Sequence, residues 1–121
     1  MTRINVIPPA ELCDKHLLAE YRELPRVFRL ARACPDAPKE YTLGRGHVMF
    51  FYDKLAYLTK RFDQLVGEMI TRGWHPKFLE VPAWVYDLPY ELWGDYIPTS
   101  ADITINRARI SERLRNRGAN P

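Results

Sequence analysis

The sequence lacks the features that identify several large classes of protein. None of its apolar runs approaches the roughly 20 residues that a membrane-spanning helix needs. Its first five residues contain no apolar signal core, and no repeat or low-complexity segment follows them. The turn Gly44-Arg45-Gly46 is too short for a glycine-rich nucleotide-binding fingerprint. We therefore expect a soluble cytoplasmic protein that does not bind a membrane.

Cysteine and histidine are too few and too scattered for a metal centre. Cys13 and Cys34 form no metal-binding framework, and we expect free thiols, with a bridge between the two as the alternative. His16, His47 and His75 show no ligand spacing. His47 follows a glycine-containing turn, where it either belongs to a loop that faces nucleic acid or caps the next helix. We predict no metal and no cofactor.

Basic residues are absent from a long stretch in the second half of the chain. Residues 78–106 contain five acids and no Lys or Arg, whereas residues 107–117 contain five arginines and one acid. The net charge is +3, a mild indication of polyanion binding. This uneven distribution predicts a field with one basic and one acidic side.

Apolar residues recur at helical spacing in three segments, approximately 10–33, 48–72 and 100–116. Between the last two, residues 74–98 hold four prolines and many aromatics, which we interpret as an ordered, aromatic-pinned loop with room for a helical turn. We therefore predict an all-α fold, with one domain over residues 1–121. It has three main helices, long connecting loops and an N-terminal arm packed near the first helix.

Particular residues mark where these helices bend, begin and end. Pro25 interrupts the first helix, and we predict a kink rather than a stop because the apolar stripe keeps its phase across it. Gly73 fits the end of the second helix, and Thr99 or Ser100 fits the N-cap of the third. The inward face of the third helix is expected to comprise Ile103, Ile110 and Leu114.

The first and third helices also carry polar faces. On the first, a cationic face comprises Lys15, Arg22, Arg26 and Arg29, and a separate stripe comprises His16, Glu20 and Glu23. On the third, a basic face suited to phosphate comprises Asn106, Arg109, Arg113 and Arg117. The pattern alone favours the alternative of solvated faces, with intrahelical ion pairs between the glutamates and neighbouring arginines.

Several short blocks, in order along the chain, carry a family resemblance. They are Met1-Thr2-Arg3-Ile4-Asn5, Ala19-Glu20-Tyr21-Arg22-Glu23-Leu24-Pro25-Arg26-Val27-Phe28, Gly46-His47-Val48 with Phe50-Phe51-Tyr52-Asp53-Lys54-Leu55, Gly94-Asp95-Tyr96-Ile97-Pro98 and Arg107-Ala108-Arg109. With these blocks the chain resembles the pyrimidine-dimer DNA glycosylases of the phage T4 endonuclease V type. The run around Glu23 is the most specific of them.

The resemblance implies a DNA-repair glycosylase/AP lyase that acts on double-stranded damaged DNA. In that family the α-amine of the residue exposed by removal of Met1, here Thr2, attacks the sugar C1′. The base leaves, an imine forms, and β-elimination cuts the strand. Glu23 matches the carboxylate that assists the sugar and proton steps. The matching DNA contacts are Arg3, His16, Arg22 and Arg26 near the site and the phosphate contacts Arg109 and Arg113 on the third helix.

An α-amine suits this chemistry because its reference pKa of about 7.7–8 is far below the value of about 10.4 for lysine. A useful fraction is therefore neutral and nucleophilic near neutral pH. Nearby cations such as Arg3 or Arg22 would lower the pKa of the amine further.

The sequence departs from the family pattern in three places. Lys15 stands where the best-known member has Gln, the loop at residues 34–43 is shorter and less basic, and the aromatic-basic C-terminal tail associated with engaging the dimer is absent. Cyclobutane pyrimidine dimers are the leading substrate, and the same amine chemistry on AP sites or another modified base is the alternative. A non-catalytic DNA-binding module is a third hypothesis, against which Thr2 and Glu23 argue. We expect a monomer.

Overall fold

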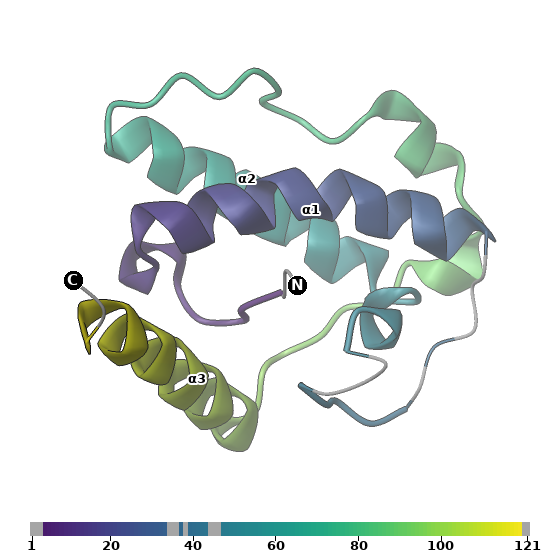
Figure 1. Cartoon of the computed structure of the whole chain (residues 1–121). Coiled ribbons are helices and arrows are strands. Elements are labelled where there is room, and N and C mark those ends of the chain that lie inside the picture. The colour runs from purple at the N-terminus through teal and green to yellow at the C-terminus, as the bar shows by residue number, and fades with distance from the viewer. Residues whose placement is uncertain (1–3, 34–36, 38, 44–46, 120–121) are drawn as a thin grey trace.

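Three α-helices form the framework of the computed structural model, which describes residues 4–33, 37, 39–43 and 47–119, with side chains as far as Arg113 (Figure 1). The helices are α1 (Asp14–Ala33), α2 (Leu55–Thr71) and α3 (Ser100–Ala119), and the connections contain the short 3-10 helices η1 (Pro9–Glu11), η2 (Met49–Phe51), η3 (Ala83–Asp87) and η4 (Tyr90–Leu92). These described residues contain no β-strand. The predicted all-α fold with three main helices is therefore confirmed.

Two predicted helices begin later than the sequence suggested. The first begins at Asp14 rather than near residue 10, because Leu12 adopts extended backbone (φ −83°, ψ 139°) after η1. The helix predicted over 48–72 is divided into η2 and α2, since Lys54 between them leaves the helical region (φ −124°, ψ 46°). Leu12 and Lys54 are neither Gly nor Pro, so the sequence carries no local signal for either break.

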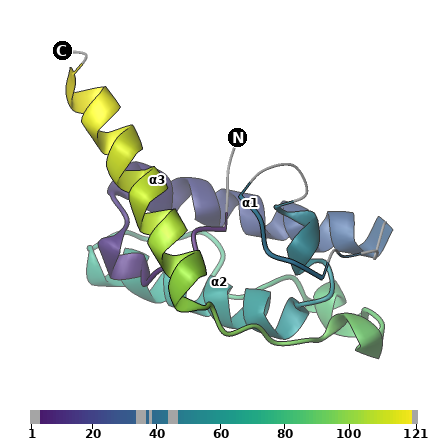
Figure 2. The same ribbon diagram turned by 90° about the horizontal axis from the view of Figure 1, so that it is seen from below.

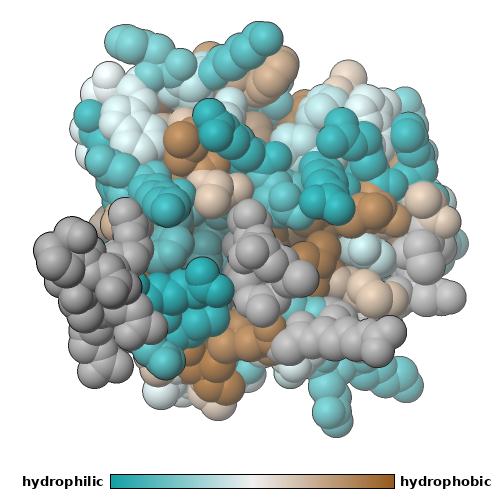
Figure 3. Space-filling model, viewed as in Figure 1, coloured by the Kyte–Doolittle hydropathy of each residue, from teal (hydrophilic) through white to brown (hydrophobic). Residues whose placement is uncertain are grey.

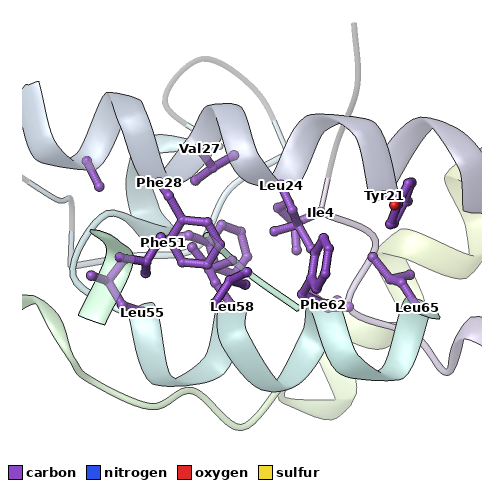
Figure 4. Close-up of a cluster of buried hydrophobic side chains, with 14 of the residues drawn as sticks. Ile4, Tyr21, Leu24, Val27, Phe28, Phe51, Leu55, Leu58, Phe62 and Leu65 are labelled. Carbon is purple, nitrogen blue, oxygen red and sulfur yellow. The ribbon is translucent and has the colours of Figure 1, made fainter. Parts of the chain in front are cut away.

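The main apolar core lies between α1 and α2 (Figure 4). Its fully buried members include Leu24 and Phe28 of α1 and Leu55, Leu58 and Leu65 of α2. Each such side chain contributes about 1.5–3 kcal/mol when removed from water. The helical spacing that predicted these elements is thus the spacing that builds their shared interface.

Pro25 does not end α1 and Gly73 does end α2, as the sequence predicted. α1 continues through Pro25 for two further turns, so this proline does not end the helix. Gly73 has a positive φ of 85°, which glycine adopts without strain. The Trp74 N–H donates to the Met69 carbonyl across this glycine (2.9 Å), as in a Schellman motif that ends α2.

The third helix begins at a capping threonine and packs through one face. Thr99 Oγ1 accepts a hydrogen bond from the Asp102 N–H (3.1 Å), so Thr99 rather than Ser100 is the N-cap. Ile110 is buried and Ile103 packs against the core as predicted, while the side chain of Leu114 lies outside the described residues. Figure 2 shows the C-terminal half of α3 extending beyond α1 and α2.

The connection from α2 to α3 is pinned to the framework, as its aromatics predicted. The rings of Tyr86 and Trp93 stack with centroids 5.7 Å apart. The Gly94 N–H donates to the Asp53 carbonyl (3.0 Å). A Cβ at Gly94 would lie 2.6 Å from that same oxygen, so only glycine allows this close approach.

Candidate active site and DNA interface

The N-terminal arm at residues 4–7 is buried, and it runs between α1 and α3 (Figure 1). The Ile4 N–H donates to Nε2 of His47 (3.0 Å), and Nδ1 of His47 lies 2.7 Å from the Thr42 carbonyl. Because a carbonyl only accepts, Nδ1 carries the proton. His47 is 2% exposed. It therefore anchors the arm, and it does not cap η2, whose N-cap is Val48. The turn at residues 44–46 that precedes it lies outside the described residues.

A buried ion pair joins α1, α2 and the arm. Glu20 and Arg61 are both almost fully buried. Arg61 donates from Nε to Glu20 Oε2 (2.6 Å) and from NH2 to Oε1 (3.0 Å). Burial alone lowers the pKa of Arg61, but attraction and hydrogen bonds to Glu20 outweigh it and raise the pKa above its ordinary value. The guanidinium is therefore charged.

The prediction of a solvated or intrahelical role for Glu20 is wrong. Glu20 lies three residues after Leu17 and four before Leu24, which places it within the apolar stripe. Arg61 stands in the same relation to Leu58 and Leu65 on the second helix. Two opposite charges within two facing core stripes are a signal that could have identified the pair.

Asn5 connects this ion pair to the third helix. Its backbone N–H and its Nδ2 both donate to Glu20 Oε1, at 3.0 and 2.8 Å. Its Oδ1 accepts a hydrogen bond from NH2 of Arg109 on α3. The Asn5 side chain therefore contacts residues of both α1 and α3. The ion pair of Glu20 with Arg61 links these contacts to α2.

Glu23 lies one helical turn after Glu20 and remains accessible. Its side chain is 20% exposed, and Oε1 lies 3.7 Å from NH1 of Arg26, which is 63% exposed. This distance is longer than a hydrogen bond, and an ion pair with so exposed a partner contributes little stability. The intrahelical pairing suggested by the sequence thus exists for Glu23, and it leaves the carboxylate available to a bound molecule.

Comparison with known families agrees with this arrangement. The model of the family described as pyrimidine dimer DNA glycosylase matches residues 1–79 of the 121 in the chain. The chain belongs to this family. It is a DNA glycosylase of the repair type that acts on damaged DNA. The matched span covers Glu23 as well as Asn5, Glu20 and Arg61.

The other predicted contacts of the glycosylase are spread over two helices. His16 is half-buried, with Nδ1 3.4 Å from Sγ of Cys13, and Arg22 is exposed. Arg113 is exposed one turn beyond Arg109. Thr2 and Arg3 lie outside the described residues.

Asn106 does not belong to the basic face of α3. It is fully buried, and its Nδ2 donates to Tyr41 Oη (2.6 Å) and to the Asp102 carbonyl (2.8 Å). Its place among the arginines at helical spacing suggested a phosphate contact, which is wrong. The described part of this face that can meet DNA therefore comprises Arg109 and Arg113.

A cavity of about 600 Å³ opens beside α1 in the glycosylase. It is lined by Tyr21 and Arg22 of α1, Phe62 of α2 and the segment after α2 that holds Trp74 and Phe78. Tyr21 fixes this segment, since its hydroxyl donates to the Phe78 carbonyl (3.0 Å) and accepts from the Phe78 N–H (2.9 Å). Aromatic walls with a cation at the rim form a surface suited to a planar base.

The glycosylase shows neither a metal-ligand cluster nor a membrane-spanning helix among its described residues. Within the part of the chain that the structure describes, no three His, Cys, Asp or Glu side chains gather as metal ligands would. No helix among the described residues is both long and apolar enough to cross a bilayer. On the face drawn in Figure 3, hydrophilic side chains predominate and the apolar ones form separate patches.

Proposed function

We propose that this glycosylase is bifunctional, cleaving the N-glycosidic bond of a damaged pyrimidine and then cutting the strand through a Schiff base. The nucleophile is the Thr2 α-amine left by removal of Met1, and Glu23 transfers the protons. Cyclobutane pyrimidine dimers are the leading substrate. Double-stranded DNA is held by Arg3, His16, Arg22, Arg26, Arg109 and Arg113.

The steps of the proposed reaction require neither a metal nor an added cofactor. The amine lone pair forms a C1′–N bond as the base leaves with the electrons of the glycosidic bond and takes up a proton. Ring opening, with Glu23 giving a proton to the ring oxygen, produces an imine. Loss of a C2′ proton to the carboxylate then expels the 3′ phosphate by β-elimination. Water hydrolyses the imine and restores the amine.

The observation that carries this proposal is the attachment of the arm to α1 beside Glu23. The Asn5 N–H lies 3.0 Å from Glu20 Oε1. Thr2 precedes Asn5 by three residues, which span at most about 11 Å. Glu23 follows Glu20 by three residues, a rise of about 4.5 Å along the helix. These short separations along the chain and the helix support the pairing of the Thr2 amine with the accessible carboxylate of Glu23.

Trapping of the covalent intermediate tests the proposal. The protein is incubated with UV-irradiated, AP-site and undamaged duplexes and then treated with borohydride, which reduces an imine to a stable amine. We expect an adduct with the UV-irradiated and AP-site duplexes and none with undamaged DNA. An adduct with AP-site DNA alone would support the same amine chemistry on a different lesion. Binding without any adduct would favour a non-catalytic module.

A further inference from the structure

The buried ion pair of Glu20 and Arg61 directs its remaining hydrogen bonds to the N-terminal arm. Glu20 Oε1 accepts from both the N–H and the Nδ2 of Asn5. NH1 of Arg61 donates to the Ile7 carbonyl (2.6 Å). A buried ion pair is often no better for stability than apolar residues of the same size. Its contacts instead fix two points of the arm, one on each side of Val6.

Val6 occupies a strained conformation between these two points. Its φ is +28°, in a region that β-branched residues rarely adopt. The Ile7 N–H folds back onto the Asn5 carbonyl, which makes a tight turn around Val6. Strain of this kind persists only where the surroundings impose it, and it concentrates at functional sites. The Asn5 and Ile7 contacts are what hold this turn in place.

We propose that Asn5 and Arg61 are positioning residues for the N-terminal nucleophile. The inference rests on the proposed function, because it concerns the amine of Thr2. The turn at Val6 sets the direction in which the chain leaves Asn5 toward its N-terminus, and the ion pair fixes that turn relative to α1 and Glu23. A displacement of about 1 Å at a reacting group costs as much as 100-fold in rate.

The burial of both residues separates this role from substrate binding. Asn5 is 3% and Arg61 2% exposed, so neither side chain forms part of the surface that DNA approaches. Each acts through the arm, and each is expected to affect the chemical step rather than the affinity.

The variant Asn5→Ala tests the proposal by removing only some of the contacts that hold the arm. It removes the Nδ2 bond to Glu20 and the bond to Arg109, and keeps the backbone N–H bond to Glu20. We expect the single-turnover rate of adduct formation on AP-site DNA to fall about 10- to 100-fold. The dissociation constant for the same duplex should change much less than the rate, because Arg109 keeps its charge when it loses its bond to Asn5. Rates are measured below the onset of unfolding of each variant.

A second variant and two controls keep the test specific. Arg61→Lys keeps the charge, cannot reproduce the three bonds of Arg61, and should also slow the chemical step without weakening binding. Val66→Ala removes buried apolar volume elsewhere on α2 and should leave the adduct rate unchanged. Acetic anhydride should label the N-terminal amine of Asn5→Ala and unsubstituted protein at equal rates, because the amine is present and only displaced.

The outcomes distinguish the inference from the proposed function. Adduct formation by Asn5→Ala at the unsubstituted rate would overturn the positioning role while leaving the amine chemistry intact. A loss no greater than that of Val66→Ala at matched stability would also overturn it. If the unsubstituted protein formed no adduct on any duplex, the proposed function would fail and the positioning role with it.

Discussion

Two glutamates one helical turn apart have opposite environments in this glycosylase. Glu20 is buried and bound by Arg61 and Asn5, whereas Glu23 is partly exposed beside Arg26. Helical periodicity placed both glutamates on one polar stripe. It could not distinguish their environments, because the pattern of a single helix does not show which residues pack against it. The chemical role proposed for Glu23 comes from the resemblance around it, whereas the long-range contacts of Glu20 show its structural role.

Replacement of the accessible carboxylate should stop catalysis without disturbing binding. Glu23→Gln keeps the size of the side chain and removes its ability to exchange a proton. We expect strand cleavage to fall by about 10²–10⁴-fold, the usual contribution of general acid–base catalysis. Cleavage of AP-site DNA and binding by fluorescence anisotropy provide the two measurements. Glu91→Gln, an exposed glutamate of η4, is the matched control, and equal loss in both variants would refute the role of Glu23.

At the scale of elements, the sequence predicted the helices better than the contacts that hold the helices and the N-terminal arm together. Period-3.6 stripes are local signals, so α1, α2 and α3 were found, and Gly73 marked an end correctly. The attachment of the arm depends on partners 43 residues away for Ile4–His47 and 41 for Glu20–Arg61. Such pairs become neighbours only when the chain folds. The positions of Glu20 and Arg61 within apolar stripes were a signal for their pairing, whereas no periodic pattern indicates the contact of Ile4 with His47.

Ion pairs between elements should differ greatly in their contribution to stability. Glu20→Gln leaves the buried Arg61 charge without its partner and should lower the free energy of unfolding by about 3–5 kcal/mol. Glu11→Gln breaks the exposed pair that joins η1 to Arg107 of α3 and should lower the free energy of unfolding far less. Urea unfolding of the two variants measures the difference. Similar losses would contradict the assignment of Glu20 as the buried link.

The exposed pair also has a defined pH dependence. Hydrogen bonds from Arg107 hold the pKa of Glu11 below its ordinary value. The stability contributed by this pair is therefore present above the ordinary glutamate pKa and is lost as pH falls through the lowered one. Melting temperatures of unsubstituted protein and Glu11→Gln should converge on acidification. A gap that widened toward low pH would contradict this sign.

Over the whole molecule, the acidic and basic parts of the second half lie on opposite sides. Figure 1 places η3 and η4, in the stretch without Lys or Arg, far from the C-terminal half of α3. This arrangement supports the predicted field with one basic and one acidic side, which stays a prediction. DNA, as a polyanion, should approach from the side of α3 and the arm.

This polarity predicts which arginines affect binding in a salt-dependent manner. Arg113→Gln should weaken binding to duplex DNA and reduce the slope of log K against log salt by about 1, as expected for one phosphate contact. Arg32→Gln removes the same charge from the opposite side, where the guanidinium lies over the ring of Trp84 of η3 (4.5 Å). Titrations at several salt concentrations should leave the slope of this control unchanged. Equal slopes for both variants would argue against α3 as the DNA-facing side.

The most direct test of the central claim is to identify the atom that joins the protein to DNA in the trapped adduct. Protein and AP-site duplex are reduced with borohydride and digested, and the modified peptide is sequenced by mass spectrometry. Protein that retains Met1 is the matched control, because its amine is displaced by one residue. We predict that the sugar is attached to the α-amine of Thr2 and that the control forms no adduct. Attachment to a lysine such as Lys15, or equal trapping of the control, would contradict the account.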